Sequence, residues 1–164
     1  MKLKTQIVII AFALGVSTSL VSSQDRPSQQ IQAATPTIVG VWQVTKMGVN
    51  CDDPNQQLTP PFPDLLIFHG DGTMTENDGT EGGLSATSGY GSWQREPGSQ
   101  NYSFRYTAFS IDENGALAIS GVIAANVHLT DANNYTSGAT IQIFDADGNL
   151  IATFCGRATG TRFQ

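Results

Sequence analysis

The residues Val39–Gly48, which read VGVWQVTKMG, are the starting point for predicting the fold of this chain. The stretch opens with Gly40-Val41-Trp42 and is rich in β-branched and aromatic residues, which is typical of a β-strand. We predict that it is the first strand of a closed antiparallel barrel. The last strand, Leu150–Phe163, is its expected closing partner.

The rest of the chain after Val39 also has the pattern of strands. Short apolar runs are separated by Gly, Thr, Ser and Asn, and no long stretch keeps the apolar spacing of a helix. Four tight turns, at residues 70–72, 113–115, 131–133 and 147–149, contain residues that tolerate positive φ. We therefore expect an all-β fold, an eight-stranded antiparallel up-and-down barrel with no C-terminal helix. The predicted strands are Val39–Gly48, Asp64–His69, Thr73–Asn77, Tyr90–Glu96, Tyr102–Ile111, Ala116–Thr130, Asn134–Asp145 and Leu150–Phe163.

The chain of 164 residues is expected to divide into three parts. Residues 1–23 have the basic start, short apolar run and small residues of a secretory signal peptide. Residues 24–37 are polar and without periodicity, so we interpret them as a flexible leader. Residues 38–164 form the predicted barrel domain, and the protein is expected to be secreted or periplasmic.

Charge and cysteine content narrow the partners and the compartment. Residues 24–164 contain six Lys and Arg residues against fourteen Asp and Glu residues, a formal net charge of −8. A nucleic acid or an anionic membrane is therefore not an expected partner, since both need a basic patch. The two cysteines, Cys51 and Cys155, are expected to form a disulfide bond in a secreted chain.

The pairing of the first and last strands can be tested by residue numbers, because antiparallel partners have a constant sum. Trp42 with Arg162 gives 204, and Cys51 with Cys155 gives 206. One register with a small slip, such as a β-bulge, would serve both pairs.

These features resemble the lipocalin and avidin group of barrels. The resemblance consists of Gly40 and Trp42 in the first strand, a long loop at residues 49–63, a meander of eight strands and Arg162 near the end. It implies that Trp42 closes the barrel floor and that Arg162 lies over its indole ring. The runs FPDLLIFHGDGTMTE, GYGSWQRE and CGRATGTRF also resemble a set of uncharacterised secreted bacterial lipocalin-like proteins.

The strand faces predict where a ligand could bind. Large aromatic residues face one side of the interior, and small residues face the other, so that a pocket could lie between them. The expected aromatic wall consists of Phe68, Trp93, Phe104 or Tyr102, and Tyr106, and the small wall of Gly121, Ala125, Ala139 and Ala158. Glu76 and Arg95 either pair with each other inside and orient the ligand, or lie at the rim. The large side chains could also reach across and fill the space.

Few residues in the sequence suggest catalysis. It contains two histidines, His69 and His128, and no Gly-x-Ser-x-Gly, phosphate-binding loop or dinucleotide fingerprint. We predict no catalytic residue, no metal site and no cofactor. The run Asp145–Asn149 resembles part of a calcium loop, but a hairpin turn explains it better.

Three functions remain open. The first is a secreted barrel that binds a small, partly apolar molecule without catalysis. The second is a barrel cyclase or isomerase that resembles allene oxide cyclase and dirigent proteins, and the third is a structural or interaction module with a filled barrel. Self-association through the outer wall of residues 116–163 is a further expectation, because its side chains are mostly small and weakly polar.

Overall fold

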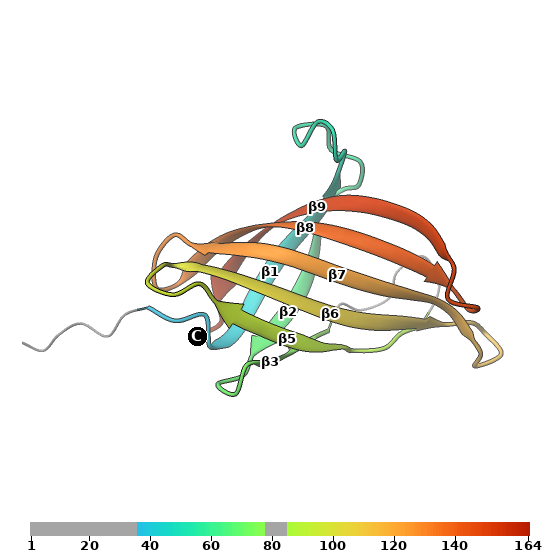
Figure 1. Cartoon of the computed structure of the whole chain (residues 1–164), viewed down its shortest axis with the longest axis horizontal. Helices are drawn as coiled ribbons and strands as arrows, with labels where there is room; N and C mark the ends of the chain where they lie inside the picture. Colours follow the sequence, from blue (N-terminus) through green and yellow to red (C-terminus); the bar gives the residue numbers. More distant parts are fainter. Residues whose placement is uncertain (1–35, 78–84) are drawn as a thin grey trace, which may run out of the picture. The chain divides into compact units, whose positions relative to one another are not determined.

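The computed structural model describes residues 36–77 and 85–164 of the chain. In these two ranges the chain forms β-strands and no helix, which confirms the predicted all-β class. The predicted signal peptide and residues 24–35 of the predicted leader lie outside the described residues. The strands are β1 (Gly40–Val49), β2 (Phe62–Phe68), β3 (Thr73–Glu76), β4 (Ser85–Ala86), β5 (Gly89–Arg95), β6 (Asn101–Ile111), β7 (Leu117–Leu129), β8 (Asn134–Asp145) and β9 (Leu150–Arg162) (Figure 1).

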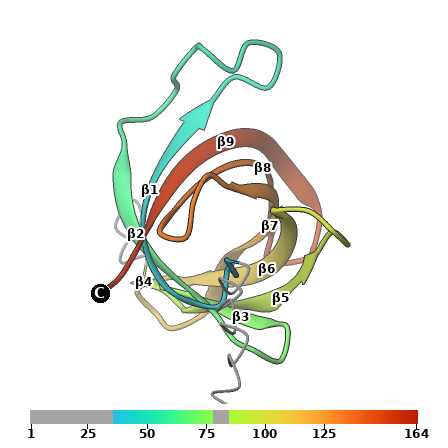
Figure 2. The same cartoon turned by 90° about the vertical axis from the view of Figure 1, so that its left-hand side faces the viewer.

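Eight of the strands close into an antiparallel barrel, as predicted. β1 pairs with β2, β2 with β3, β3 with β5, and each later strand with its successor until β9 returns to pair with β1. Figure 2 shows the strands arranged as a ring. The two residues of β4 pair with the far end of β6, beyond the residues of β6 that pair with β5. β4 lies between the predicted strands Thr73–Asn77 and Tyr90–Glu96, where no strand is predicted.

β1 and β9 meet in one unbroken register. Trp42 is the partner of Arg162, and Val49 is the partner of Cys155, so that every pair keeps the same sum of residue numbers. The predicted pairing of Trp42 with Arg162 is confirmed, but the predicted slip before the cysteines does not occur. Cys51 instead lies beyond the end of β1 and forms the predicted disulfide with Cys155, with 5.0 Å between the two Cα atoms.

Alternate side chains on each strand face the barrel interior, as the two-residue period of a strand requires. Ala125, Val127 and Leu129 of β7 alternate in this way and are buried, and so is Tyr135 of β8. The hydrophobic core consists of Ile38, Trp42, Val44, Leu66, Phe68, Met74, Tyr102, Phe104, Tyr106, Ala125, Val127, Leu129 and Tyr135.

Trp42 closes one end of the barrel, and Arg162 covers it. The indole is fully buried and donates its Nε1–H to the carbonyl oxygen of Ile38 at 2.7 Å. The Arg162 guanidinium lies 4.4 Å from the centre of the Trp42 ring, a cation–π contact, and donates to the carbonyl oxygens of Val39 and Thr37 at 2.7 and 2.6 Å. Gly40 has a φ of 136°, and a Cβ there would lie 2.5 Å from the Arg162 Nη1. A glycine is therefore needed two residues before the tryptophan.

The described residues contain no helix that is long and apolar enough to cross a membrane.

Candidate functional site

A cavity of about 510 Å³ occupies the barrel interior on the inner side of the Trp42 floor. At its inner end it is lined by Val44, Leu66 and Tyr135, which lie next to the packed core. At its outer end it is lined by Ile119 and Ile143, near the ends of β7 and β8. The barrel interior is therefore not filled by side chains.

Part of the cavity lies along a row of paired residues in which one large side chain is followed by three small ones. Phe104 of β6 pairs with Ala125 of β7, Ala125 with Ala139 of β8, and Ala139 with Gly156 of β9. One aromatic ring thus faces three small residues around the wall, and none of the three can reach across the interior. All four residues line the cavity. The predicted contrast between an aromatic and a small side is present in this row.

A group of polar side chains lies in the inner part of this apolar cavity. The ammonium of Lys46 donates to Glu76 Oε1 at 2.8 Å and to the Tyr106 hydroxyl oxygen at 3.1 Å, and its Nζ lies 2.6 Å from Asp64 Oδ2. The Tyr106 hydroxyl also donates to Glu76 Oε1 at 3.4 Å. Asp64 and Glu76 are buried, with exposed fractions of 6% and 1%. We call these four residues, Lys46, Asp64, Glu76 and Tyr106, the Lys46 cluster.

The surroundings of the Lys46 cluster fix the protonation of its lysine and tyrosine. Burial disfavours the charged form of Lys46, but Tyr106, Asp64 and Glu76 more than offset this, so that the pKa of Lys46 is raised above its ordinary value. Burial also raises the pKa of Tyr106, against the opposing effect of Lys46. Near neutral pH the cluster therefore holds a charged ammonium and a neutral phenol.

Tyr135 adds a second phenol at the inner end of the cavity. Its exposed fraction is 2%, and its ring packs edge-on against Trp42 with 4.9 Å between the ring centres. Gly160 is its partner on β9, and a Cβ at Gly160 would overlap the tyrosine ring. Among the described residues no group forms a hydrogen bond with the Tyr135 hydroxyl. Burial raises the pKa of this phenol, and the nearby Asp64 raises it further, so it is protonated near neutral pH.

The structure separates the predicted ligand-binding residues into two groups. Glu76, Phe104, Ala125 and Ala139 line the cavity. The other three, Phe68, Trp93 and Arg95, are not among the residues that line it.

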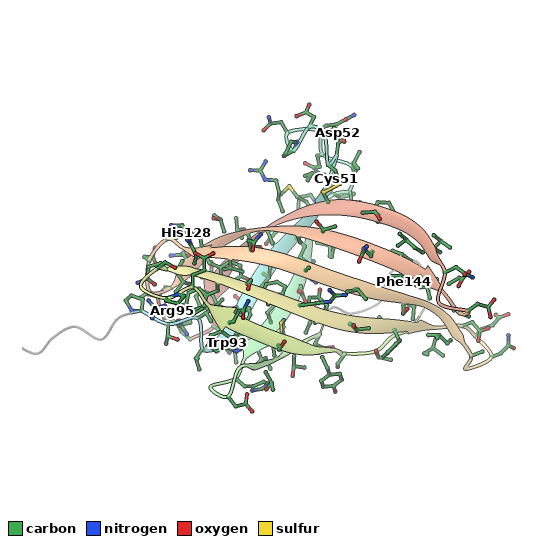
Figure 3. All side chains as sticks on the ribbon, in the orientation of Figure 1. Cys51, Asp52, Trp93, Arg95, His128 and Phe144 are labelled. Carbon is green, nitrogen blue, oxygen red and sulfur yellow. A yellow bond between two sulfur atoms is a disulfide. The ribbon has the colours of Figure 1, made fainter. Side chains whose placement is uncertain are left out.

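Phe68 and Trp93 pack against each other instead, with ring centres 6.3 Å apart, and the Trp93 indole donates to the carbonyl oxygen of His69 at 2.9 Å. Arg95 is exposed, donates to the carbonyl oxygen of Ser99 at 2.8 Å and lies 5.6 Å from the centre of the Tyr102 ring. Figure 3 shows Trp93 and Arg95 at the end of the barrel away from Phe144. Glu76 thus pairs with Lys46 rather than with Arg95.

Asp64 and Tyr135 were not assigned to a site by the sequence analysis. Asp64 shares its strand face with Leu66 and Phe68, and this parity is the signal that could have placed it inside. Tyr135 shares its strand face with Ala139, but a sequence does not show whether a buried hydroxyl has a partner. The role of Lys46 as the partner of both carboxyl groups depends on the packing of β1, β2 and β3.

A second hollow, of about 610 Å³, lies on the outer wall of the barrel. Arg157 donates to the carbonyl oxygen of Pro54 at 3.1 Å along it, and His128 Nδ1 lies 2.8 Å from Asn101 Oδ1. The first contact connects β9 to the loop after β1, and the second connects β7 to β6. In the described part of the chain no three His, Cys, Asp or Glu residues are grouped to hold a metal ion.

No protein-family model matches this chain, and a search of the curated proteins found no match. The function is therefore inferred from the cavity and the Lys46 cluster.

Proposed function

We propose that this barrel binds a small, partly apolar molecule in its cavity, without catalysing a reaction. The cavity of about 510 Å³ carries this proposal. Pockets for small molecules usually have about 300–1,000 Å³, with apolar walls and a few placed polar groups. Here the apolar walls come from residues such as Phe104, Ile123 and Ile141, and the polar groups include Lys46, Glu76 and Tyr106 of the Lys46 cluster and Tyr135.

The way in which the barrel is closed supports a lipocalin-like assignment within this proposal. The contact of Arg162 with the Trp42 ring, and the need for glycine at position 40, give the resemblance a physical basis. The disulfide between Cys51 and Cys155 supports secretion to an oxidising compartment. Both assignments are proposals.

Filling the cavity tests the proposal. The neutral dye N-phenyl-1-naphthylamine should bind the wild-type protein with an increase in fluorescence. Ala139→Phe should weaken this binding by at least about tenfold, because the new ring would occupy space next to Phe104 and Ala125. Ala125→Phe should do the same.

Thr140→Phe is the matched control, because Thr140 follows Ala139 on β8 but is exposed on the outer face. This variant should bind the dye as the wild type does. Circular dichroism and cooperative unfolding should show that the two cavity variants and Thr140→Phe are folded. Unchanged binding by Ala139→Phe would contradict the proposal, and so would unfolding of both cavity variants, which would show that the interior is filled in solution.

The second candidate is a cyclase or isomerase. It is favoured by one observation, the hydrogen-bonded Glu76, Tyr106 and Lys46 inside an apolar cavity, since such groups can transfer protons. Native mass spectrometry of protein purified from its own host would identify a retained molecule. Incubation of that molecule with fresh protein should leave it unchanged if the protein only binds it. A chromatographic shift at unchanged mass, lost in Glu76→Gln, would instead indicate an isomerase.

A further inference from the structure

The Tyr135 hydroxyl limits the kind of molecule that the cavity can hold. Tyr135 lines the inner end of the cavity, and its hydroxyl is buried and has no hydrogen-bond partner among the described residues. A buried hydroxyl without a partner destabilises a folded protein, so native structures rarely keep one. Ser110 and Ser137 also line the cavity, but both are only half-buried and can be hydrated. Tyr135 therefore gains most from a polar group on a ligand.

The Lys46 cluster determines which hydrogen bond remains to be made. The ammonium of Lys46 has three hydrogens, and it has three oxygen atoms of Asp64, Glu76 and Tyr106 within 3.1 Å. The Tyr106 hydroxyl already donates to Glu76. Among these phenol and ammonium groups, Tyr135 is therefore the donor that a ligand can use, and the ligand must supply an acceptor.

The charges around Tyr135 argue against an ionic ligand. With both carboxyl groups ionised, the Lys46 cluster carries a formal charge of −1, and an anion would be repelled at the low dielectric constant of this cavity. A cation would have to compete with the ammonium of Lys46, which already forms ion pairs with both acids. An uncharged oxygen meets neither obstacle.

We propose that the cavity takes an uncharged, mostly apolar molecule with one carbonyl oxygen, of the ketone, aldehyde or ester class, and that this oxygen accepts the hydrogen bond of the Tyr135 hydroxyl. The inference rests on the proposed binding function and specifies its ligand. The apolar part of the molecule would lie between Phe104 and the small residues Ala125 and Ala139.

Three naphthalene probes of the same shape test this inference by calorimetric titration. These are 2-acetylnaphthalene with a carbonyl oxygen, 2-isopropenylnaphthalene with a methylene group in its place, and the anion 2-naphthoate. The ketone should bind the wild-type protein about fivefold to tenfold more tightly than the alkene, as a single hydrogen bond provides. The naphthoate should bind at least about tenfold more weakly than the ketone.

Tyr135→Phe removes the hydroxyl and should bind the ketone and the alkene about equally tightly. Its melting temperature without ligand should be equal to or higher than that of the wild type, because no hydrogen bond is lost. Ser137→Ala removes another hydroxyl from the same cavity and should keep the preference. These two variants separate the role of Tyr135 from a general effect of cavity polarity.

The outcomes distinguish the two proposals. If the ketone and the alkene bind the wild type equally well, the binding function stands and the ligand class is wrong. The same holds if the preference persists in Tyr135→Phe or disappears in Ser137→Ala. If none of the three probes binds, the proposed function and this inference both fail.

Discussion

At the scale of single residues, Lys46 is the most consequential side chain of the interior. It lies 2.6 Å from Asp64 Oδ2 and 2.8 Å from Glu76 Oε1, and both acids are buried. An ion pair buried in this way adds little net stability, because each charge has lost its hydration. Removal of one partner is different, since the remaining charges are then buried without compensation.

Lys46→Met should therefore lower the free energy of unfolding by about 3–5 kcal/mol, as measured by urea denaturation near neutral pH. The pKa of Lys46 is raised in the folded state, so its contribution is fully present below the ordinary value of 10.5 and is lost as pH rises through the folded value. The difference between variant and wild type should thus stay constant as pH rises from neutral toward 10.5.

Lys46→Met combined with Asp64→Asn and Glu76→Gln is the control, because it also removes the two acids. The triple variant should be more stable than Lys46→Met alone. Equal stability of Lys46→Met and the wild type would show that the Lys46 cluster is hydrated rather than buried.

Parity in the sequence predicts which residues face inward but not which partner they meet. Glu76 shares its face with Met74 and is inside, but its partner is Lys46 and not Arg95, as the inside alternative required. Arg95 shares its face with Trp93 but lies at an exposed strand end, where Tyr102 and Ser99 hold it. The sequence does not reveal how high along the barrel a residue lies, because this depends on the stagger of neighbouring strands.

At the scale of elements, the hairpin turns are stabilised by the same kind of hydrogen bond. Asp71, Asp112, Asp131 and Asp145 each accept hydrogen bonds from backbone N–H groups of their own turn. Hydrogen bonds favour the charged carboxylate, so the pKa of all four is lowered. The largest cause is a side-chain bond from Thr73 for Asp71 and from Asn149 for Asp145, and a backbone bond for Asp112 and Asp131. Short-range chemistry of this kind is visible in the sequence, which is why the turns and the strand ends were predicted to within about two residues.

Asp145 provides a test of how much the aspartate carboxylate stabilises its turn. The Asn149 side chain and the N–H groups of Asn149 and Asp147 donate to its carboxylate, and these bonds lower its pKa. Asp145→Asn should lower the melting temperature near neutral pH, because its amide would place one donor against the Asn149 amide.

The sign of the pH dependence follows from the lowered pKa. The contribution of the Asp145 charge is present above the unfolded value, about 3.8, and is lost as pH falls through the folded value. The gap in melting temperature between wild type and variant should therefore narrow below about pH 3.8. Asp147→Asn removes the same charge from the same turn without removing these acceptors, and should show a smaller gap. If the difference in melting temperature between the wild type and Asp145→Asn does not change with pH, the charge of Asp145 does not stabilise the turn.

β4 shows the limit of such local patterns. Its two residues, Ser85 and Ala86, have no recognisable strand period, and they lie outside the predicted strands. They pair with Ile111 and Ser110 because β6 extends past the residues that pair with β5. A strand of this kind is determined by the length of its neighbour, which only the folded barrel shows.

At the scale of the whole barrel, closure could be predicted because two distant pairs fit nearly the same register. Whether the barrel is filled could not be predicted, because the answer depends on the direction of each large side chain. Phe68 and Trp93 pack near the closed end, whereas Phe104 faces Ala125 and leaves the cavity open. Self-association through the outer wall stays a prediction, which sedimentation of the protein at micromolar concentration would test.

The disulfide joins the two strands whose pairing closes the barrel. Cys155 lies on β9, and Cys51 follows β1 at the start of the loop whose Leu58 and Thr59 line the cavity. The bond spans a separation of 104 residues, so it removes much of the freedom of the unfolded chain.

Replacement of both cysteines by serine should lower the free energy of unfolding by about 2–4 kcal/mol and keep the β-sheet spectrum, because the hydrogen-bonded register of β1 and β9 does not depend on the bond. The wild type in the presence of a reductant should unfold at the same urea concentration as the double variant. Thiol counting in denaturant without reductant should find no free thiol in protein from an oxidising compartment. Two reactive thiols there, or equal stability of the oxidised and reduced protein, would mean that strand pairing alone holds the barrel closed.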